Sequence, residues 1–387
     1  LQQLGKTPFF KKQKPTPYDE AVSLIWYLEN VFYQAAGRIL SFMKSQFADE
    51  ISAGNPVINM GFWPGGDRDG NPFVTSDITL KVADALRGSI IKCYYLDVRK
   101  LRRRLTFEGV EGKLQELEKK LYNNIFIPGY TADLKKAEVL DTLYEIRELI
   151  VFNHNGLFLN LVDGLINRVH LFGLHFATLD IRQDSSVHSL VITEICALSG
   201  KEDYSAMDDA QKIEWLSSLS TAVILDESVT AITKDTIDSV KAVKHIQEQN
   251  GKPGSDRYII SQCNSAVDIL EVFALFIFGG WKRDAISVDI IPLFETIGDL
   301  KNAADVMQVL YTFPLYRDHL KRRGNRQTVM LGFSDGTKDG GYLMANYSIF
   351  HAKQSLTAVS AKYQIDVVFF DGRGGPPARG GGKTHKF

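Results

Sequence analysis

Six short, continuously apolar segments separated by helical sequence most constrain the fold of this chain. They occupy residues 55–63, 174–182, 257–263, 285–296, 327–335 and 365–373. Apolar residues that run on without alternation are expected in strands whose two faces are both covered by helices. The last four segments recur at intervals of about 30 to 40 residues, which is typical of a parallel sheet or an α/β barrel.

Polar and glycine-rich sequence gathers at the carboxyl ends of five of these six segments. The stretches are GGDRDGNP, DIRQDS, FET, SDGTKDGG and DGRGGPPARGGG. In α/β barrels the active site is built from the loops that follow the strands. The pattern therefore favours an α/β fold of the barrel type over an open, doubly wound sheet.

The remaining sequence is largely helical. Apolar residues at helical spacing occur over residues 19–43, 81–105, 111–122 and 134–152, and a KPTP turn precedes the first of these ranges. We expect one incomplete catalytic barrel domain over residues 1–387. Residues 1–55 and 80–170 would form helical segments around it, and residues 171–387 would supply barrel strands with their helices.

The net charge, the apolar runs and the cysteines of the chain limit the classes of function that it can have. The net charge of −1 and the pI near 6.8 give no general attraction to nucleic acid or anionic lipid. The longest apolar run, which begins at Val272, is about half of what a bilayer crossing needs. Cys93, Cys196 and Cys263 lie far apart and are predicted to be reduced, buried thiols in a cytoplasmic protein.

Two carboxylates at neighbouring strand ends, Glu295 and Asp335, predict a site for Mg²⁺ or Mn²⁺, which prefer oxygen ligands. The alternative is that each carboxylate caps a helix or pairs with a nearby arginine. The eight histidines have no zinc-like spacing.

Cations occur at the same ends: Arg182, Lys338, Arg373 and Arg379. Arginine recognises phosphate and carboxylate in a bidentate manner, and adjacent glycines let the backbone approach an anion. The alternative for the last stretch is a disordered RNA-binding tail. The anion-binding loop is favoured because the stretch follows a strand directly, holds only two arginines and lacks aromatic residues. The basic run RKLRRRL at 99–105 is predicted to be a solvated helix face rather than a nucleic-acid patch.

Five motifs in one order resemble the phosphoenolpyruvate carboxylase family. They are GGDRDGNP, LDIRQDS, PLFET, GFSDGTKDGG and GRGG followed by RGGG, and the resemblance covers essentially the whole chain. It implies an Mg²⁺- or Mn²⁺-dependent lyase that joins bicarbonate to phosphoenolpyruvate and gives oxaloacetate and phosphate. Bicarbonate would attack the phosphoryl group to form carboxyphosphate and the pyruvate enolate, which then captures CO₂. Both intermediates are anionic, so the site needs cations and exclusion of water.

The resemblance also implies a role for each matching residue. The metal-ligand positions are Glu295 and Asp335, and the catalytic cations are Arg182, Lys338, Arg373 and Arg379. Arg182 would lie beside the phosphoryl group, whereas Lys338 and Arg373 would bind bicarbonate-derived and phosphate oxygens. Arg379 would also reach an aspartate inhibitor in the full-length protein. The substrate-binding walls would come from Trp63, Asp67, Arg68, Asp69, Gly372, Gly374 and Gly375, although the DRD residues could mainly hold their own loop together by ion pairs.

Two departures from the family pattern shape the expectation for this chain. Asp371 stands where many relatives have histidine, and the family's histidine motif T-A-H-P-T-E is absent. The resemblance implies that this motif lies upstream, and that further barrel and tetramer-forming sequence lies beyond Phe387. We therefore expect about six of eight barrel strands here. The chain alone would be inactive, within a cytoplasmic homotetrameric parent that has no nucleic-acid or membrane partner. The alternative is a non-catalytic fragment that binds phosphoenolpyruvate or metal.

Overall fold

The computed structural model describes residue 6 and residues 14–47, 51, 57–127, 134–198, 203–223 and 228–372. The chain divides into two compact units. A helical unit comprises residues 1–65 and 77–177, and a sheet unit comprises residues 66–76 and 178–387.

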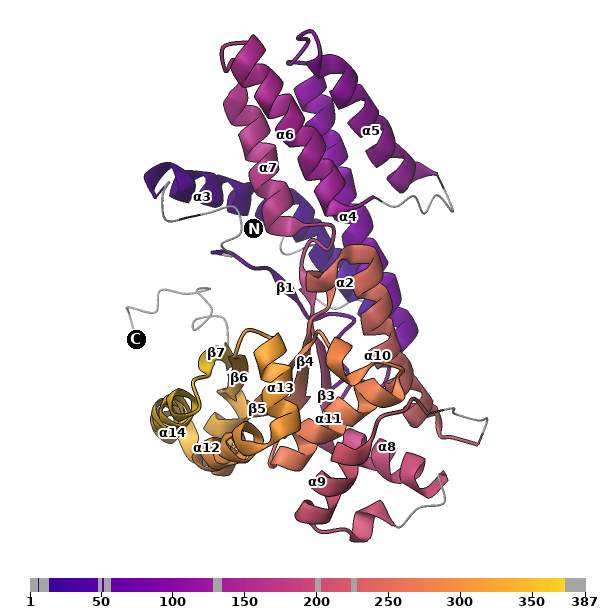
Figure 1. Cartoon of the computed structure of the whole chain (residues 1–387), viewed down its shortest axis with the longest axis vertical. Helices are drawn as coiled ribbons and strands as arrows, with labels where there is room; N and C mark the ends of the chain where they lie inside the picture. The colour runs from indigo at the N-terminus through magenta and orange to yellow at the C-terminus, as the bar shows by residue number, and fades with distance from the viewer. Residues whose placement is uncertain are drawn as a thin grey trace. The chain divides into compact units, whose positions relative to one another are not determined.

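The helical unit is built from long amphipathic helices. Its elements are α2 (Pro17–Tyr27), the π-helix η1 (Leu28–Phe32), α3 (Tyr33–Gln46), β1 (Gly61–Phe62), α4 (Ser76–Arg102), α5 (Val110–Phe126), α6 (Lys136–Asn153) and α7 (Leu159–Phe172). Helix α2 begins at the predicted KPTP turn, where Thr16 and Asp19 form a capping box and Pro17 occupies the first turn. Helix α6 packs between α5 and α7 (Figure 1). The four predicted helical ranges are confirmed.

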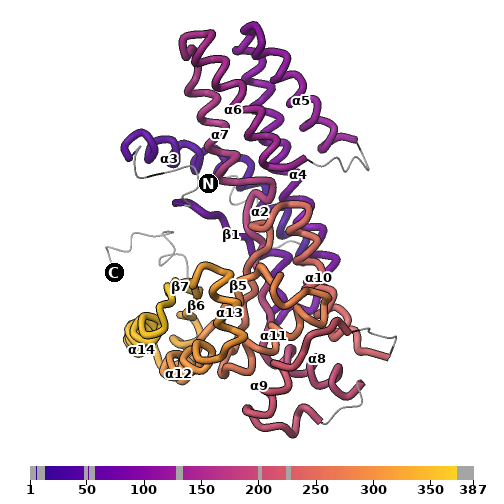
Figure 2. Tube along the Cα trace, in the orientation of Figure 1, coloured from indigo at the N-terminus to yellow at the C-terminus, as the bar shows by residue number. Residues whose placement is uncertain are grey.

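The sheet unit alternates strands and helices. Its elements are β2 (Thr178–Leu179), β3 (Ile181–Asp184), α8 (Ser185–Leu198), η2 (Tyr204–Ala206), α9 (Asp209–Ser218), α10 (Ala231–Asn250), η3 (Lys252–Gly254), β4 (Arg257–Ser261), α11 (Ala266–Phe278), η4 (Arg283–Ala285), β5 (Asp289–Phe294), α12 (Ile297–Thr312), α13 (Pro314–Arg322), β6 (Arg326–Gly332), α14 (Ser334–Lys362) and β7 (Asp366–Gly372). From β3 to β7 the Cα trace passes through at least one helix between successive strands, as a parallel sheet requires (Figure 2).

Five strands form one parallel sheet in the order β3-β4-β5-β6-β7. The register aligns Arg182 with Ile259, and Met330 with both Leu293 and Phe370. Strands β4 and β5 are buried almost throughout, and α11 is buried along its whole length. The prediction of a helix-rich α/β fold with parallel strands is therefore confirmed, whereas closure into a barrel stays a prediction.

The sheet differs from the sequence-based expectation at both of its edges. The predicted strand 174–182 is divided into β2 and β3, and Arg182 lies inside β3 rather than at its end. Strand β7 is only half-buried, because it has one strand neighbour among the described residues. Helix α14 is kinked at Gly341, where φ is 79°, and it exposes Leu343 and Phe350.

Two further expectations can be compared with the described residues. All three cysteines are free and buried, as predicted. No helix in the described ranges is both long and apolar enough to cross a membrane. The single barrel domain expected over residues 1–387 stays a prediction.

Candidate functional site

The loop of residues 66–76 is paired along β3 in the sheet unit. The Arg182 amide donates to the Gly66 carbonyl (3.0 Å), and the Arg68 amide donates to the Arg182 carbonyl (2.8 Å). A Cβ atom on Gly66 would lie 2.0 Å from the Asp180 carbonyl oxygen, so only glycine permits this approach. The GGDRDGNP motif therefore places its carboxylates directly beside the β3 edge.

Arg182 is held by two of those carboxylates. Its Nε and Nη2 donate to the two Asp67 oxygens at 2.7 and 2.9 Å, and Nη2 lies 3.5 Å from Asp69 Oδ2. Burial acts to lower the pKa of Arg182. The hydrogen bond to Asp67 and the charges of Asp67, Asp69 and Glu295 outweigh it and leave the pKa raised. The guanidinium is a fixed, permanent cation at this strand.

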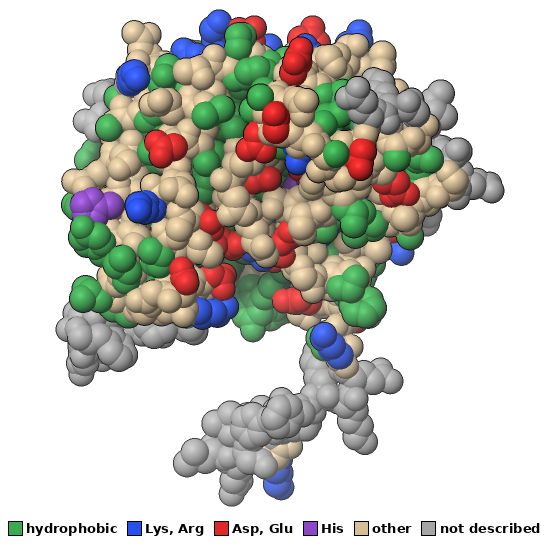
Figure 3. Space-filling model, turned by 90° about the horizontal axis from the view of Figure 1, so that it is seen from below, with side chains coloured by type: hydrophobic (Ala, Val, Ile, Leu, Met, Phe, Trp, Pro, Cys, Tyr) green, Lys and Arg blue, Asp and Glu red, His purple; other side chains and the backbone are tan. Residues whose placement is uncertain are grey.

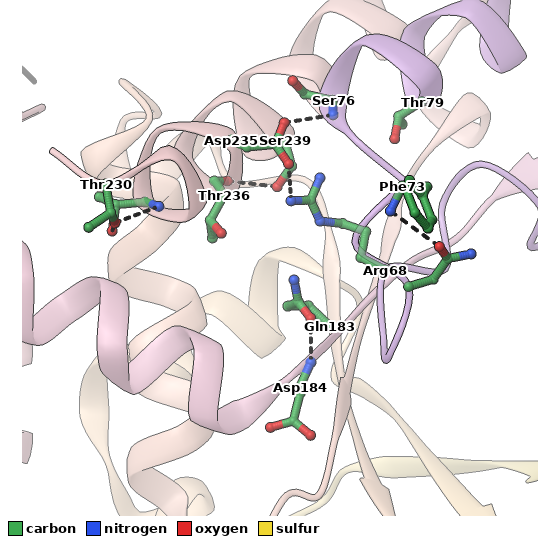
Figure 4. A network of polar contacts seen from close by, with 12 residues as sticks. Arg68, Phe73, Ser76, Thr79, Gln183, Asp184, Thr230, Asp235, Thr236 and Ser239 are labelled. Carbon is green, nitrogen blue, oxygen red and sulfur yellow. Dashed lines mark hydrogen bonds and ion pairs between the residues drawn. The ribbon is translucent and has the colours of Figure 1, made fainter. Parts of the chain in front are cut away.

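Arg68 points away from this cluster and anchors the loop instead. Its side chain is 4% exposed and forms an ion pair with Asp235 of α10. The second Asp235 oxygen accepts from the Ser76 amide at 2.9 Å, so one carboxylate holds both the start and the end of the loop (Figure 4). Arg68 thus holds the loop by an ion pair, but its partner lies on α10 rather than among the DRD residues.

Glu295 lies directly after β5, between the end of β4 on one side and the end of β6 with the start of α14 on the other. Its Oε2 accepts from the Gln262 amide at the end of β4 (3.2 Å). Glycines 332 and 336 pack against it, since a Cβ on either would lie 3.1 to 3.2 Å from the Glu295 backbone. Burial raises the pKa of Glu295, and the charge of Asp335 raises it further. The two carboxylates are thus close enough to repel each other.

Asp335 lies in the first turn of α14 rather than at the end of the strand predicted over residues 327–335, because β6 ends at Gly332. Its Oδ1 accepts from Lys338 Nζ at 2.6 Å. That hydrogen bond and the Asp335 charge raise the pKa of Lys338. The Lys338 side chain is 77% exposed, so this cation can exchange Asp335 for an incoming anion at little cost.

The donor set fits a hard divalent cation. Glu295 and Asp335 are carboxylates that repel each other, and a cation between them would relieve that repulsion. Water commonly supplies the other ligands of Mg²⁺. Among the described residues no group of three or more His, Cys, Asp or Glu side chains could hold a metal.

The roles predicted for the remaining residues are not tested by the structure. Trp63 falls in the helical unit. Gly372 ends β7, and Asp371, where many relatives have histidine, is paired with Lys353 (2.7 Å). Arg373, Gly374, Gly375 and Arg379 lie outside the described residues. Their roles stay predictions.

Sequence reasoning missed two residues that organise the site. Gln262 supplies the amide that binds Glu295 and has a φ of 51°, a left-handed conformation that is uncommon for a residue with a side chain. Asp235 lies within α10 and belongs to no recognisable motif, so its pairing with Arg68 is visible only in the structure.

The surface seen in Figure 3 carries Asp and Glu side chains over its middle, with Lys and Arg mainly nearer its rim.

The fold and the charged cluster together define a helix-rich α/β protein that gathers carboxylates and cations at the carboxyl ends of parallel strands. This is where proteins of that class bind their ligands. The model of the family described as phosphoenolpyruvate carboxylase matches residues 1–127 and 128–387. The chain belongs to this family.

Curated relatives support the same assignment. The chain is 29% identical to the phosphoenolpyruvate carboxylase of Gloeobacter violaceus over 98% of its length, which covers 47% of that protein. It is 30% identical to the enzyme of Shewanella halifaxensis over 100% of its length, covering 47%, and 31% identical to that of Aliivibrio salmonicida, again over 100% and 47%. The chain thus spans about half the length of the relatives it matches.

Proposed function

We propose that this chain forms the metal- and phosphate-binding part of a phosphoenolpyruvate carboxylase. The reaction would carboxylate phosphoenolpyruvate with bicarbonate to give oxaloacetate and phosphate. The observation that carries the proposal is the cluster of Arg182, Glu295, Asp335 and Lys338. These residues come from three separate motifs and interact electrostatically.

The charge balance of the described cluster supports a metal-assisted reaction on an anion. Asp67, Asp69, Glu295 and Asp335 face only two cations, Arg182 and Lys338. A doubly charged phosphate ester would be repelled unless further positive charge were present. Glu295 and Asp335 would hold Mg²⁺ or Mn²⁺, which when bound neutralises charge on substrate oxygens. Arg373 and Arg379 would add the remaining cations.

Each described residue then has a defined task. The Asp67 carboxylate fixes the Arg182 fork in one orientation, so that an incoming phosphoryl group meets a preorganised donor. Lys338 is exposed and can leave Asp335 for an anionic oxygen. The loop of residues 66–76 contributes the wall that carries Asp67 and Asp69.

The proposal extends to the complete fold and the assembly of the parent protein. The five parallel strands would belong to a (β/α)₈ barrel, with further strands supplied by β1 and by sequence outside the chain. The parent would be a cytoplasmic homotetramer whose oxaloacetate feeds the tricarboxylic acid cycle, with Arg379 reaching an aspartate inhibitor. Support comes from the family membership and from helices that connect successive strands of the described sheet.

Oxaloacetate formation, coupled to malate dehydrogenase, tests the catalytic proposal. A longer protein that carries this chain within the length of its relatives should turn over with Mg²⁺ or Mn²⁺ and not without either. This chain alone should give no product, because the histidine motif is absent from it. An inactive longer protein would overturn the proposal, and turnover by the chain alone would overturn the expectation that it is inactive.

Metal titration tests the alternative, which is a non-catalytic fragment that still binds metal. Electron paramagnetic resonance of free Mn²⁺ should show binding by the chain, and Asp335→Asn should weaken that binding by roughly tenfold or more. Asp305→Asn, an exposed change on α12, serves as the matched control. Equal Mn²⁺ affinity for the wild type and Asp335→Asn would remove Asp335 from the metal site.

A further inference from the structure

A hydrogen bond from one acidic side chain joins the start of α14 to the start of α12. Asp339 Oδ2 accepts from the Ile297 amide at 3.0 Å, and the two residues lie 42 positions apart in the sequence. Ile297 is the first residue of α12, so its amide has no acceptor within its own helix. Among the described residues, this is the one side-chain hydrogen bond that connects residues 334–340 to another helix or strand.

The capping of α12 does not require this bond. Thr296 and Asp299 already form a capping box at the start of the helix, and α11 begins with the same kind of box. A further carboxylate at a helix N-terminus is favoured by the helix dipole. The dipole does not explain, however, why the carboxylate comes from the GFSDGTKDGG motif, which also carries Asp335 and Lys338.

The two bonded residues are close in sequence to the two carboxylates of the candidate site. Asp339 lies four residues after Asp335, so both residues lie on the same face of the first segment of α14. Ile297 lies two residues after Glu295. The hydrogen bond between Asp339 and Ile297 therefore fixes the separation of Asp335 and Glu295 from about one helical turn away.

The first segment of α14 depends on such a bond because the rest of the helix does not orient it. Gly341 interrupts the helix with a φ of 79°, and residues 334–340 precede this interruption. Gly340 packs closely on α12, since a Cβ atom there would lie 2.8 Å from Ile297 Cγ1. Such packing sets how near the two helices lie, whereas a directional hydrogen bond also sets how the segment is turned.

We propose that Asp339 is a positioning residue that sets the separation of Glu295 and Asp335 for a divalent cation. The inference rests on the proposed function, in which these two carboxylates hold Mg²⁺ or Mn²⁺. Hydrogen bonds that orient metal ligands commonly change the metal affinity by roughly tenfold to a hundredfold. Asp339 acts through the Ile297 amide and does not itself bind the cation.

Electron paramagnetic resonance of free Mn²⁺, measured with the chain, tests this role. Asp339→Ala removes the acceptor and should weaken Mn²⁺ binding by roughly tenfold. Asp339→Asn keeps an oxygen that can accept from the Ile297 amide, so the affinity should stay within about threefold of the wild type.

Asp208→Ala is the matched control. The Asp208 carboxylate also accepts from a first-turn amide of a helix in the same unit, that of Gln211 in α9 (2.9 Å). Its removal should leave the Mn²⁺ affinity unchanged. Wild-type affinity in Asp339→Ala, or an equal loss in Asp208→Ala, would overturn the inference. A loss in Asp339→Asn as large as that in Asp339→Ala would also overturn it, because the carboxylate charge would then act on the cation directly.

Hydrogen exchange without metal distinguishes this inference from the proposed function. Asp339→Ala should accelerate the exchange of the amides of residues 338–340 by roughly tenfold, since the segment loses its bond to α12. Unchanged exchange there, together with Mn²⁺ binding by the wild type, would overturn the role of Asp339 and leave the metal site in place. Accelerated exchange in a chain that binds no Mn²⁺ would overturn the proposed metal site and, with it, the role of Asp339 toward the cation.

Discussion

Gly66 shows how a single residue sets the position of the candidate site. The Asp180 carbonyl occupies the space that any side chain at position 66 would need. The Arg182 amide donates a hydrogen bond to the Gly66 carbonyl at the same place. The carboxylates of Asp67 and Asp69 reach Arg182 because the backbone approaches so closely here.

Gly66→Ala should therefore lower the free energy of unfolding by roughly 1 to 3 kcal/mol, since the new methyl group forces the backbone apart. Urea denaturation followed by circular dichroism measures the change. Gly298→Ala is the matched control in the same unit, because its Cβ would meet only Thr296 Oγ1, at 3.7 Å. An unchanged stability for Gly66→Ala would mean that the loop is not packed on β3 as described.

Glu271 of α11 makes the stability of the sheet unit depend on pH. Its side chain is 1% exposed and accepts from Tyr204 Oη (2.9 Å). Burial raises the pKa of Glu271 from an ordinary 4.5 to about 7, with the Asp268 charge adding to the rise and Tyr204 and Lys212 opposing it. The folded protein therefore keeps a proton that the unfolded chain loses, and stability falls as pH rises through this window.

Glu271→Gln keeps an acceptor for Tyr204 and removes the titration. Its advantage over the wild type should grow from near zero at about pH 4.5 to at most about 3 kcal/mol at about pH 8, since each unit of pKa shift is worth about 1.4 kcal/mol. Urea denaturation across this pH range measures the difference. Glu214→Gln, an exposed change on α9, is the control. Parallel pH profiles for the wild type and Glu271→Gln would contradict the assignment.

At the scale of elements, the loop of residues 66–76 is fastened by α10 through Asp235. One carboxylate binds the Arg68 guanidinium near the start of the loop and the Ser76 amide at its end. The same loop carries Asp67 and Asp69, which bind Arg182. Helix α10 therefore supports the Arg182 cluster indirectly, by fixing the loop that contributes these two carboxylates.

Asp235→Asn should free the loop, because Arg68 would keep its buried charge without its ionic partner. Amide hydrogen exchange within residues 66–76 should accelerate by roughly tenfold to a hundredfold, since the loss of such a partner costs roughly 1.5 to 3 kcal/mol. Asp238→Asn on the same helix removes only an exposed pair with Lys241 and should leave the exchange rates unchanged. Equal effects of the two variants would show that Asp235 has no special role.

The elements also show how far sequence reasoning reached. Continuous apolar runs located β4, β5 and β6 because these strands are buried on both faces. The same signal overestimated β1 and the burial of β7, since local hydrophobicity does not report how many neighbours a strand has. Strand order predicts that Glu295 and Asp335 form a pair, and their joint role as metal ligands stays a prediction. The Asp235 contact to Arg68, by contrast, joins residues that no local pattern connects.

At the scale of the whole molecule, the two units carry separate cores with separate thiols. Cys93 lies in α4 of the helical unit, and Cys196 and Cys263 share one hydrophobic cluster in the sheet unit. Burial raises the pKa of Cys93 to about 12, so almost no reactive thiolate forms in the folded state. Each thiol thus reports the opening of its own unit.

Pulsed maleimide labelling over a urea series, read out for each cysteine by peptide mass spectrometry, should show one common midpoint for Cys196 and Cys263. The reason is that both become accessible only when their shared core opens. Cys93 should follow the transition of the helical unit. Clearly different midpoints for Cys196 and Cys263 would mean that the sheet unit is not one cooperative core.

The kink at Gly341 has a mechanical consequence for the turn that bears Asp335 and Lys338. With φ at 79° there, the hydrogen-bonded rod of α14 is interrupted, and the first segment of the helix is a short piece of its own. This first segment is positioned by packing: Gly336 lies against the Glu295 carbonyl, and Gly340 lies against the Ile297 side chain. The position of the turn that bears Asp335 and Lys338 is therefore set by this packing rather than by a continuous helix that runs through Gly341.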